Sequence, residues 1–286
     1  MNFKFLTLKG IKKLKAIKLT HYTLFFALAL ILSTFSCKNA IQYSTKNSSL
    51  AIDSSYNNQS EITKLITPYK TALDSEMNEV LVISAEEFPK EKGKPETKLG
   101  NLVADLSLEV ATEIYGDSID FCLLNFGGLR TSLPKGEITK GKIFELMPFE
   151  NELVVVTITK FEYERLTDYL YLVGGQPISG TKLLLKPGTL ENTNVTNLLE
   201  EAFSPNPNNY VKVLTSDYLA GGGDKMDFFL NPIRTEKVGI KLRDAIIQYC
   251  IQENAKGNQL TGKLDGRIIF EELPITLPER KKRLSK

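Results

Sequence analysis

The chain has 286 residues, 42% of them apolar, and carries a formal net charge of +2 with a single histidine, His21. This length and apolar content suffice for one large domain or two small ones. Residues 1–36 contain six lysines and no acidic residue, so the remainder has a net charge of −4 and gives no sign of nucleic-acid binding.

Residues 1–36 are predicted to be an export signal. A lysine-rich segment precedes the apolar run "TLFFALALIL" (23–32), which is short for a membrane span, and small residues lead to Cys37. This order resembles a bacterial lipobox, although Phe35 is bulky. The resemblance implies that Cys37 is lipidated and that the exported chain is anchored to the cell envelope, on its periplasmic or surface face. The alternative is a plain N-terminal membrane anchor.

The rest of the chain is expected to hold one folded region between two tails. Residues 37–60 are rich in Ser, Asn and Lys, which predicts a flexible tether. Residues 61–272 contain no internal repeat and no low-complexity segment, and we assign them to the fold. Residues 273–286 end in "ERKKRLSK", a basic tail that is expected to be solvated.

The first clear element is a helix over 99–116 that ends at Gly116. Its apolar face comprises Leu99, Leu102, Val103, Leu106, Val110 and Ile114. The apolar run "SIDFCLLNF" (118–126) follows and predicts a strand in the centre of a sheet.

Further strands are predicted at 151–159, 180–186, 210–219 and 265–270, and further helices at 161–172, 195–203 and 237–255. The last helix directs five residues toward the core: Leu242, Ala245, Ile246, Tyr249 and Cys250. Because helices and strands alternate irregularly, the expected class is α+β, with a mixed sheet layered with helices. Cys122 and Cys250 either pair, as exported cysteines often do, or are two buried thiols.

Two glycine-rich loops are candidates for ligand contact. In "LLNFGGLRTSLPKGEIT" (123–139), two glycines allow a ligand to approach the backbone, Asn125 donates and accepts, and Arg130 offers a fork of donors for phosphate or carboxylate. In "DYLAGGGDKMDFF" (217–229), Tyr218 can stack on a planar ring and Asp224 can accept hydrogen bonds from sugar hydroxyls. Taken alone, each segment is also compatible with an ordinary turn.

Phe149, which follows Pro148 in "MPFEN" (147–151), stands at the junction of a loop and a strand. By itself it reads as a core phenylalanine. Its context is more specific, because six motifs occur in a fixed order: "GNLVAD" (100–105), "NFGGLR", "LPKGEIT", "PFEN", "ISG" (178–180) and "DYLAGGGD".

In this order the motifs resemble the C-terminal domain of the 5′-nucleotidase family, which includes periplasmic UDP-sugar hydrolases and ecto-5′-nucleotidases. The resemblance covers about residues 61–270. It implies that this domain holds a nucleotide, with the base between the rings of Phe149 and Tyr218 and the sugar on Asp224. Asn125 and Arg130 then face the phosphate, Gly127 and Gly128 form the loop, and Asn151 contacts the base.

The sequence departs from the family in the stretch "KGKPETKLGN" (92–101), where an arginine is usual and none is present. Lys94 or Lys98 is the candidate for a replacement charge, as a point charge and not as a fork.

The resemblance also implies that hydrolysis belongs to a separate N-terminal metallophosphatase domain with two metal ions held by Asp, His and Asn. No metallophosphatase motif occurs here, and the one histidine lies in the signal segment. We therefore expect no catalytic residue, metal or cofactor in this chain, and divalent metals only in a partner. Three interpretations follow: a nucleotide-gripping subunit for a separate metallophosphatase chain, a non-catalytic nucleotide- or nucleoside-binding lipoprotein, and a structural or adhesive remnant without a ligand.

Overall fold

The computed structural model describes residues 24, 25, 27, 49, 60–185 and 210–270. The chain divides into two compact units, Met1–Asn58 and Gln59–Lys286. In the first unit, Leu24, Phe25 and Ala27 are helical and exposed. Cys37, most of the predicted tether, the predicted helix at 195–203 and the basic tail lie outside the described residues.

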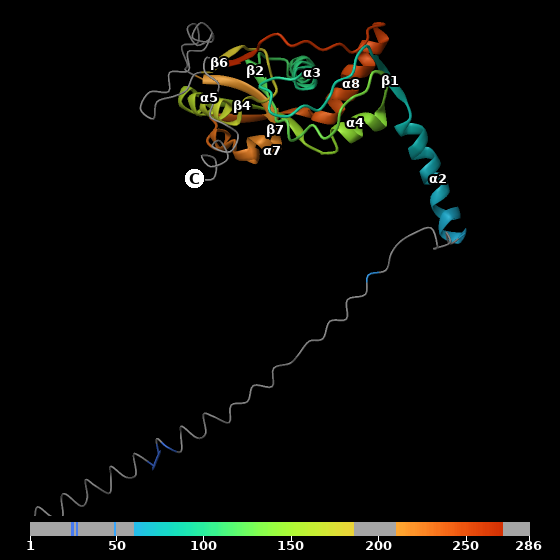
Figure 1. Cartoon of the computed structure of the whole chain (residues 1–286), viewed down its shortest axis with the longest axis horizontal. Coiled ribbons are helices and arrows are strands. Elements are labelled where there is room, and N and C mark those ends of the chain that lie inside the picture. Colours follow the sequence, from blue (N-terminus) through green and yellow to red (C-terminus); the bar gives the residue numbers. More distant parts are fainter. Residues whose placement is uncertain (1–23, 26, 28–48, 50–59, 186–209, 271–286) are drawn as a thin grey trace, which may run out of the picture. The chain divides into compact units, whose positions relative to one another are not determined.

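The centre of the second unit is a mixed five-stranded sheet with the order β5-β2-β7-β4-β8 (Figure 1). β2 runs parallel to β7, whereas the other three neighbouring pairs are antiparallel. The strands are β2 (Phe121–Leu123), β4 (Glu152–Thr159), β5 (Ile178–Ser179), β7 (Tyr210–Ser216) and β8 (Arg234–Lys241). Two smaller sheets pair β1 (Val80–Ser84) with β3 (Gly136–Thr139) and β6 (Leu183–Leu185) with β9 (Ile268–Phe270).

Both faces of the central sheet are covered, which explains why its inner strands are apolar at almost every position. Successive side chains of a strand point to opposite faces. In β4, Leu153 and Val155 belong to one hydrophobic cluster, whereas Val154 and Val156 belong to the other. The sheet is therefore the middle layer of three, and the expected class, α+β with a mixed sheet layered with helices, is confirmed.

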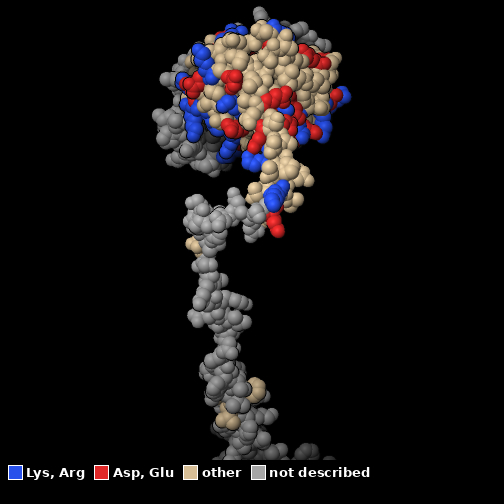
Figure 2. Space-filling model, turned by 90° about the vertical axis from the view of Figure 1, so that its right-hand side faces the viewer, with Lys and Arg blue, Asp and Glu red and all other residues tan. Residues whose placement is uncertain are grey.

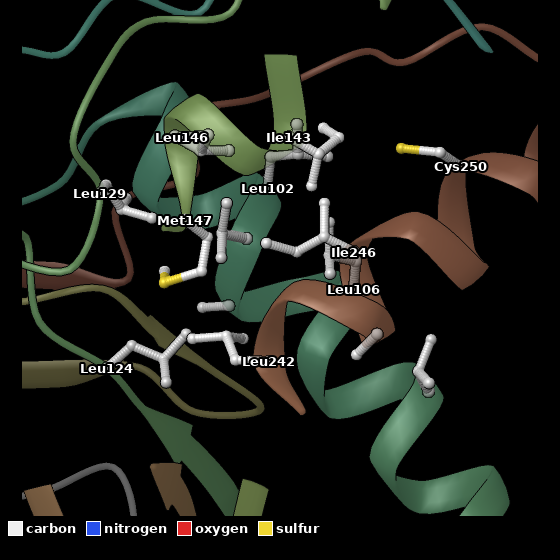
Figure 3. Packing of buried hydrophobic residues seen from close by; sticks show 14 of the residues in the cluster. Leu102, Leu106, Leu124, Leu129, Ile143, Leu146, Met147, Leu242, Ile246 and Cys250 are labelled. Carbon is white, nitrogen blue, oxygen red and sulfur yellow. The ribbon is translucent and has the colours of Figure 1, made fainter. Parts of the chain in front are cut away.

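One face of the sheet packs against α3 (Lys98–Tyr115), α4 (Lys140–Leu146) and α8 (Leu242–Ala255). Figure 3 shows Leu102 and Leu106 of α3 close to Leu242 and Ile246 of α8, with side chains from α4 beside them. The other face packs against α5 (Lys160–Val173), the segment 226–229 and β9. These two clusters contain nearly all of the buried apolar residues.

Helix ends follow the capping signals of the sequence. The side chain of Thr97 accepts a hydrogen bond from the Gly100 N–H at the start of α3, and Gly116 ends the helix in the left-handed conformation with φ 71°. α5 is bounded in the same way by Thr159 and by Gly174 at φ 82°. Such N-caps are worth about 1 kcal/mol each, and only glycine adopts the second conformation without strain.

A buried arginine joins two of the sequence motifs, "GNLVAD" and "ISG", to the segment that precedes β9. Arg267, which is 4% exposed, donates two hydrogen bonds to Asp105 of α3 and one to the carbonyl of Ile178 in β5. It also contacts the carboxylate of Asp265 at 2.9 Å. Its partners lie on three segments, and removal of any one of them would leave a buried charge incompletely compensated, which is energetically costly. This group therefore fixes α3 against β5 and the C-terminal strand.

The predicted helix at 237–255 is wrong at its start, because residues 237–241 belong to β8. Gly239 has φ 93° and lies where the pairing of β8 with β4 shifts register, as at a bulge. From Leu242 onward the helix is confirmed. Of the residues expected in the core, Tyr249 is only partly buried, and the other four are buried.

Three further expectations need correction. The strand predicted at 210–219 ends at Ser216, since residues 217–220 form the short helix α7 (Asp217–Ala220) with Ser216 as its cap. Ile114 is 42% exposed and does not join the core face of α3. The sequence prediction also omitted β1, β3, β5, α4 and α2 (Ser60–Met77).

α2 lies at the N-terminal end of the second unit, and its last turn contacts α4 through the ion pair between Lys140 and Glu76. Several of its apolar side chains are more than half exposed: Ile62, Leu65, Tyr69 and Leu73. Among the described helices, none is both long enough and apolar enough to cross a bilayer. Figure 2 shows acidic and basic side chains interspersed over the face that it presents.

Cys122 and Cys250 are both free and buried, which settles the question that the sequence left open. Burial raises the pKa of each thiol, to about 12 for Cys250, so both are protonated at neutral pH and behave as small apolar residues.

Candidate ligand-binding site

The topology of the sheet brings the two glycine loops to one edge. β2 and β7 are parallel, so the loops that follow them leave the sheet at the same end. β4 is antiparallel to β7, and therefore its first residues, which follow "PFEN", start at that same end. β8 is antiparallel to β4, so its last residues arrive there too. Four strands thus deliver loop or terminal residues to a single edge.

At this edge a pocket of about 310 Å³ opens, which is the size of a small-molecule site. All eight residues predicted to contact a ligand line it: Asn125, Gly127, Gly128, Arg130, Phe149, Asn151, Tyr218 and Asp224. Phe149 and Tyr218 are 39% and 50% exposed. The structure therefore brings together residues separated by up to 99 positions.

Asp224 is the hydrogen-bonding centre of the pocket. Asn125 donates from Nδ2 to one carboxylate oxygen at 2.6 Å, and the Tyr218 hydroxyl donates to the other at 3.1 Å. The Tyr169 hydroxyl, whose pKa burial raises to about 12, donates to the Asp224 carbonyl at 3.0 Å. These contacts hold the backbone of Asp224 at φ 52°, a left-handed conformation that is uncommon outside glycine. The carboxylate is thereby fixed between the two loops.

Arg130 borders the pocket beside Phe149. Its guanidinium carbon lies 5.8 Å from the centroid of the Phe149 ring, and Nη1 donates to the Gly127 carbonyl at 3.2 Å. The other four described arginines all pair with a carboxylate: Arg165, Arg234, Arg243 and Arg267. Within the described residues Arg130 has no such partner, so its charge is available to an anion.

Phe149 is held in place from behind by Arg243, the second residue of α8. The Arg243 guanidinium is buried, stacks 4.2 Å from the centroid of the Phe144 ring, pairs with Glu150 and donates to the Phe149 carbonyl at 3.5 Å. Lys241 also pairs with Glu150, and hydrogen bonds from Lys241 and Arg243 lower the pKa of that carboxyl to about 2. The N–H of Leu242 donates to the Asn151 carbonyl at 2.9 Å. The end of β8 therefore positions the "PFEN" loop.

Neither lysine proposed to replace the family's arginine reaches the pocket. Lys98 pairs with Glu86 and Lys94 pairs with Glu91, so both charges are satisfied elsewhere. The nearby cation is instead Lys90, whose Nζ donates to the Arg130 carbonyl at 3.3 Å. Sequence reasoning also missed Tyr169 and Arg243, which act on the pocket through Asp224 and Phe149. The sequence gives no local signal for them, because their partners are 55 and 94 positions away.

No group of three or more His, Cys, Asp or Glu side chains in the described part of the chain is arranged to hold a metal ion. The pocket itself contains one carboxylate, one guanidinium, two amides and two aromatic rings. Such a set can bind a planar, polar and anionic molecule.

Residues 79–159 match the family model of the 5′-nucleotidase, C-terminal domain. Over this segment the chain is similar to the 5′-nucleotidase C-terminal domain. The match includes "GNLVAD", "NFGGLR" and "PFEN", and so covers the half of the pocket that comes from β2 and the start of β4. The resemblance inferred from the motifs is thus confirmed.

Two curated proteins are similar to this chain over part of their length. The chain is 29% identical over 258 residues to the trifunctional nucleotide phosphoesterase protein YfkN of Bacillus subtilis, a match that covers 84% of this chain and 17% of the relative. It is 23% identical over 193 residues to a 5′-nucleotidase of Vibrio vulnificus, which covers 65% of this chain and 33% of the relative. The chain therefore spans a third or less of these two proteins.

Solved structures show the same fold. A 5′-nucleotidase precursor from Thermus thermophilus aligns with a TM-score of 0.56 and 22% identity, over 73% of this chain and 43% of that one. The NAD nucleotidase of Haemophilus influenzae aligns with a TM-score of 0.51 and 17% identity, over 74% and 41% of the two chains. At these identities the likeness concerns the fold of the C-terminal domain.

Gly223 provides a test of the position of Tyr218. A Cβ at Gly223 falls 2.5 Å from two atoms of the Tyr218 ring, whereas a Cβ at Gly221, which has φ −81°, meets only ordinary contacts at 3.5 Å. Both changes reduce the flexibility of the unfolded chain equally. We expect Gly223→Ala to lower the free energy of unfolding by about 1–3 kcal/mol relative to Gly221→Ala, in urea denaturation. Equal stabilities of the two variants would show that the ring does not lie over Gly223.

Proposed function

We propose that this protein is the nucleotide-gripping half of a 5′-nucleotidase-type phosphohydrolase in nucleotide breakdown. One observation carries the proposal: two exposed aromatic rings, an unpaired arginine and a fixed carboxylate line the same pocket at the sheet edge. Each suits one part of a nucleotide. The rings of Phe149 and Tyr218 suit the base, Asp224 suits the ribose hydroxyls, and Arg130 suits the phosphate.

The energies of these contacts are adequate for binding. Stacking of a base on an aromatic side chain contributes about 1–3 kcal/mol and is tolerant of base identity. A charged hydrogen bond from Arg130 contributes about 1.5–3 kcal/mol. Asn151 is placed to contact the base edge, and the Gly127–Gly128 turn lets the ligand approach the Asn125 side of the loop. The names of the relatives, a nucleotide phosphoesterase and a 5′-nucleotidase, agree with a nucleotide ligand.

Hydrolysis is assigned to a separate metallophosphatase chain. Two-metal phosphoester hydrolysis needs ligands that set two ions about 3.5–4 Å apart. The sequence has one histidine, at position 21, and the described residues contain no metal-binding cluster. The pocket residues accordingly hold and orient the substrate, and divalent metals enter only with the partner.

A second candidate is a nucleotide- or nucleoside-binding lipoprotein without hydrolysis. The observation that favours it is the same absence of metal ligands in the sequence and in the described pocket. In either case we place the protein in the bacterial envelope, attached through a lipid on Cys37, because a basic segment and a short apolar segment precede that cysteine. A periplasmic or surface location gives the pocket access to extracellular nucleotides.

The proposed nucleotide binding is tested by calorimetry with AMP and adenosine. Tyr218→Ala is expected to weaken the binding of both ligands by about 1–3 kcal/mol, because both contain the base. Arg130→Ala is expected to weaken the binding of AMP much more than that of adenosine, because only AMP has the phosphate. The matched control is Arg234→Ala, since Arg234 is exposed, pairs with Glu236 and lies at the other end of β4. Equal losses for the two ligands on Arg130→Ala would remove the phosphate assignment. Failure of the wild type to bind either at millimolar concentration would favour a structural role.

Catalysis is tested by phosphate release from AMP with Mn²⁺, Co²⁺ or Zn²⁺. The purified chain is expected to turn over more slowly than about 1 s⁻¹, a low rate for an enzyme. Faster turnover, retained through a second purification step, would contradict the assignment of hydrolysis to another chain. If an exported metallophosphatase chain is added, the first candidate function requires turnover to appear, and the second requires that none does.

Processing is tested by mass spectrometry of the protein purified from bacterial membranes. We expect the mature chain to begin at a lipid-modified Cys37, and Cys37→Ala to release the protein from the membrane fraction or block its processing. An unmodified Cys37 with the upstream residues attached would support the plain N-terminal anchor.

A further inference from the structure

Two basic residues, Lys90 and Arg130, lie side by side, and Arg130 lines the pocket. Lys90 Nζ donates to the Arg130 carbonyl at 3.3 Å, and among the described residues neither Lys90 nor Arg130 forms an ion pair. Two of the lysines that follow, Lys94 and Lys98, differ in this respect, because each pairs with a glutamate. Two neighbouring basic residues on this side of the pocket therefore lack an ion pair within the described part of the chain.

The backbone fixes Lys90 at this place. Phe88 and Leu133 exchange two backbone hydrogen bonds, of 2.8 and 3.0 Å, and both side chains are buried. Two residues later the N–H of Lys90 donates to Ser132 Oγ at 2.8 Å. The segment 88–90 is thus clamped against the segment that follows Arg130. Lys90 is held beside Arg130 by packed backbone and not by a chance side-chain contact.

This arrangement is electrostatically unfavourable without an anion. Partial burial, together with the charges of Arg130 and then Lys92, lowers the pKa of the Lys90 ammonium from its ordinary value. Two clamped cations of this kind lose their mutual repulsion when a multivalent anion lies between them.

We propose that Lys90 and Arg130 together form a two-cation subsite for the 5′-phosphate of the bound nucleotide. The proposal rests on the nucleotide-binding function proposed above. A phosphate monoester suits the pair because it carries nearly two charges at neutral pH and three acceptor oxygens. Arg130 supplies a planar fork, and Lys90 supplies a compact charge at a second oxygen. The subsite selects nucleotides over nucleosides and makes that selectivity depend on Lys90.

The test compares AMP with adenosine by calorimetry in the wild type, Lys90→Ala and Lys90→Arg, with Lys160→Ala as a control. Lys160 is exposed, lies on α5 outside the pocket and has no ion pair among the described residues. Lys90→Ala is expected to weaken AMP binding about 5- to 30-fold, between the effect of an exposed ion pair and that of a buried charged hydrogen bond. Adenosine binding should change less than about 2-fold, and Lys160→Ala should change neither.

A second measurement uses the pKa of Lys90. As the pH rises through that lowered pKa, Lys90 loses its charge, so wild-type affinity for AMP should fall while affinity for adenosine does not fall with it. Lys90→Arg should retain AMP binding over the same pH range, because a guanidinium stays protonated. Thermal unfolding of each variant shows whether the fold is retained.

The outcomes separate the two proposals. If the wild type binds neither ligand, the nucleotide-binding function fails and the subsite fails with it. If the wild type binds both ligands but Lys90→Ala leaves the ratio of AMP to adenosine affinity unchanged, the function stands and the subsite is wrong. If Lys90→Ala weakened the binding of both ligands equally, the subsite would also be wrong, because that result indicates a structural role for Lys90.

Discussion

Burial of both faces of the five-stranded sheet is the constraint on which the rest of the structure depends. α3, α4 and α8 cover one face, and α5 with the 226–229 segment covers the other. Neither face can then present a ligand site. The candidate pocket lies where β2 and β7 end and β4 begins, and all eight of its lining residues belong to that end of the sheet. The function of the domain is thus confined to loops, while the strands set the distances between them.

The sequence predicted which helices and strands occur better than it predicted where they begin and end. Strong periodicity identified α3, α5 and β4, since burial on one or both faces constrains most of their residues. β8 was misread as helix because "KVGIK" leads directly into a helical pattern, and only its pairing with β4 makes it a strand. β5 is two residues long and β3 is four, too short for periodicity to be visible.

The candidate site was predictable only in part, for a related reason. Each pocket residue stands in a motif with unusual local chemistry, such as glycines beside Arg130 or an exposed Tyr218 before three glycines. Residues that support the pocket have no such context. Arg243 and Tyr169 lie within regular helices, and Lys90 lies in a segment with many lysines. Their importance follows from contacts made across tens of residues, which composition and spacing do not reveal. Lys94 and Lys98 were chosen for their closeness in sequence, and glutamates neutralise both.

The distribution of charge separates structural ion pairs from groups kept for a ligand. Arg243 and Arg267 are buried, and their carboxylate partners join distant segments, which fixes the "PFEN" loop and the packing of α3. Arg130 and Lys90 stand in the opposite condition, since neither forms an ion pair within the described residues and Arg130 lines the pocket. Leaving two neighbouring cations unpaired adds nothing to the stability of the fold. The repulsion between these cations is removed when an anion binds to them. The neighbouring pocket has the aromatic rings and the carboxylate that the rest of a nucleotide requires.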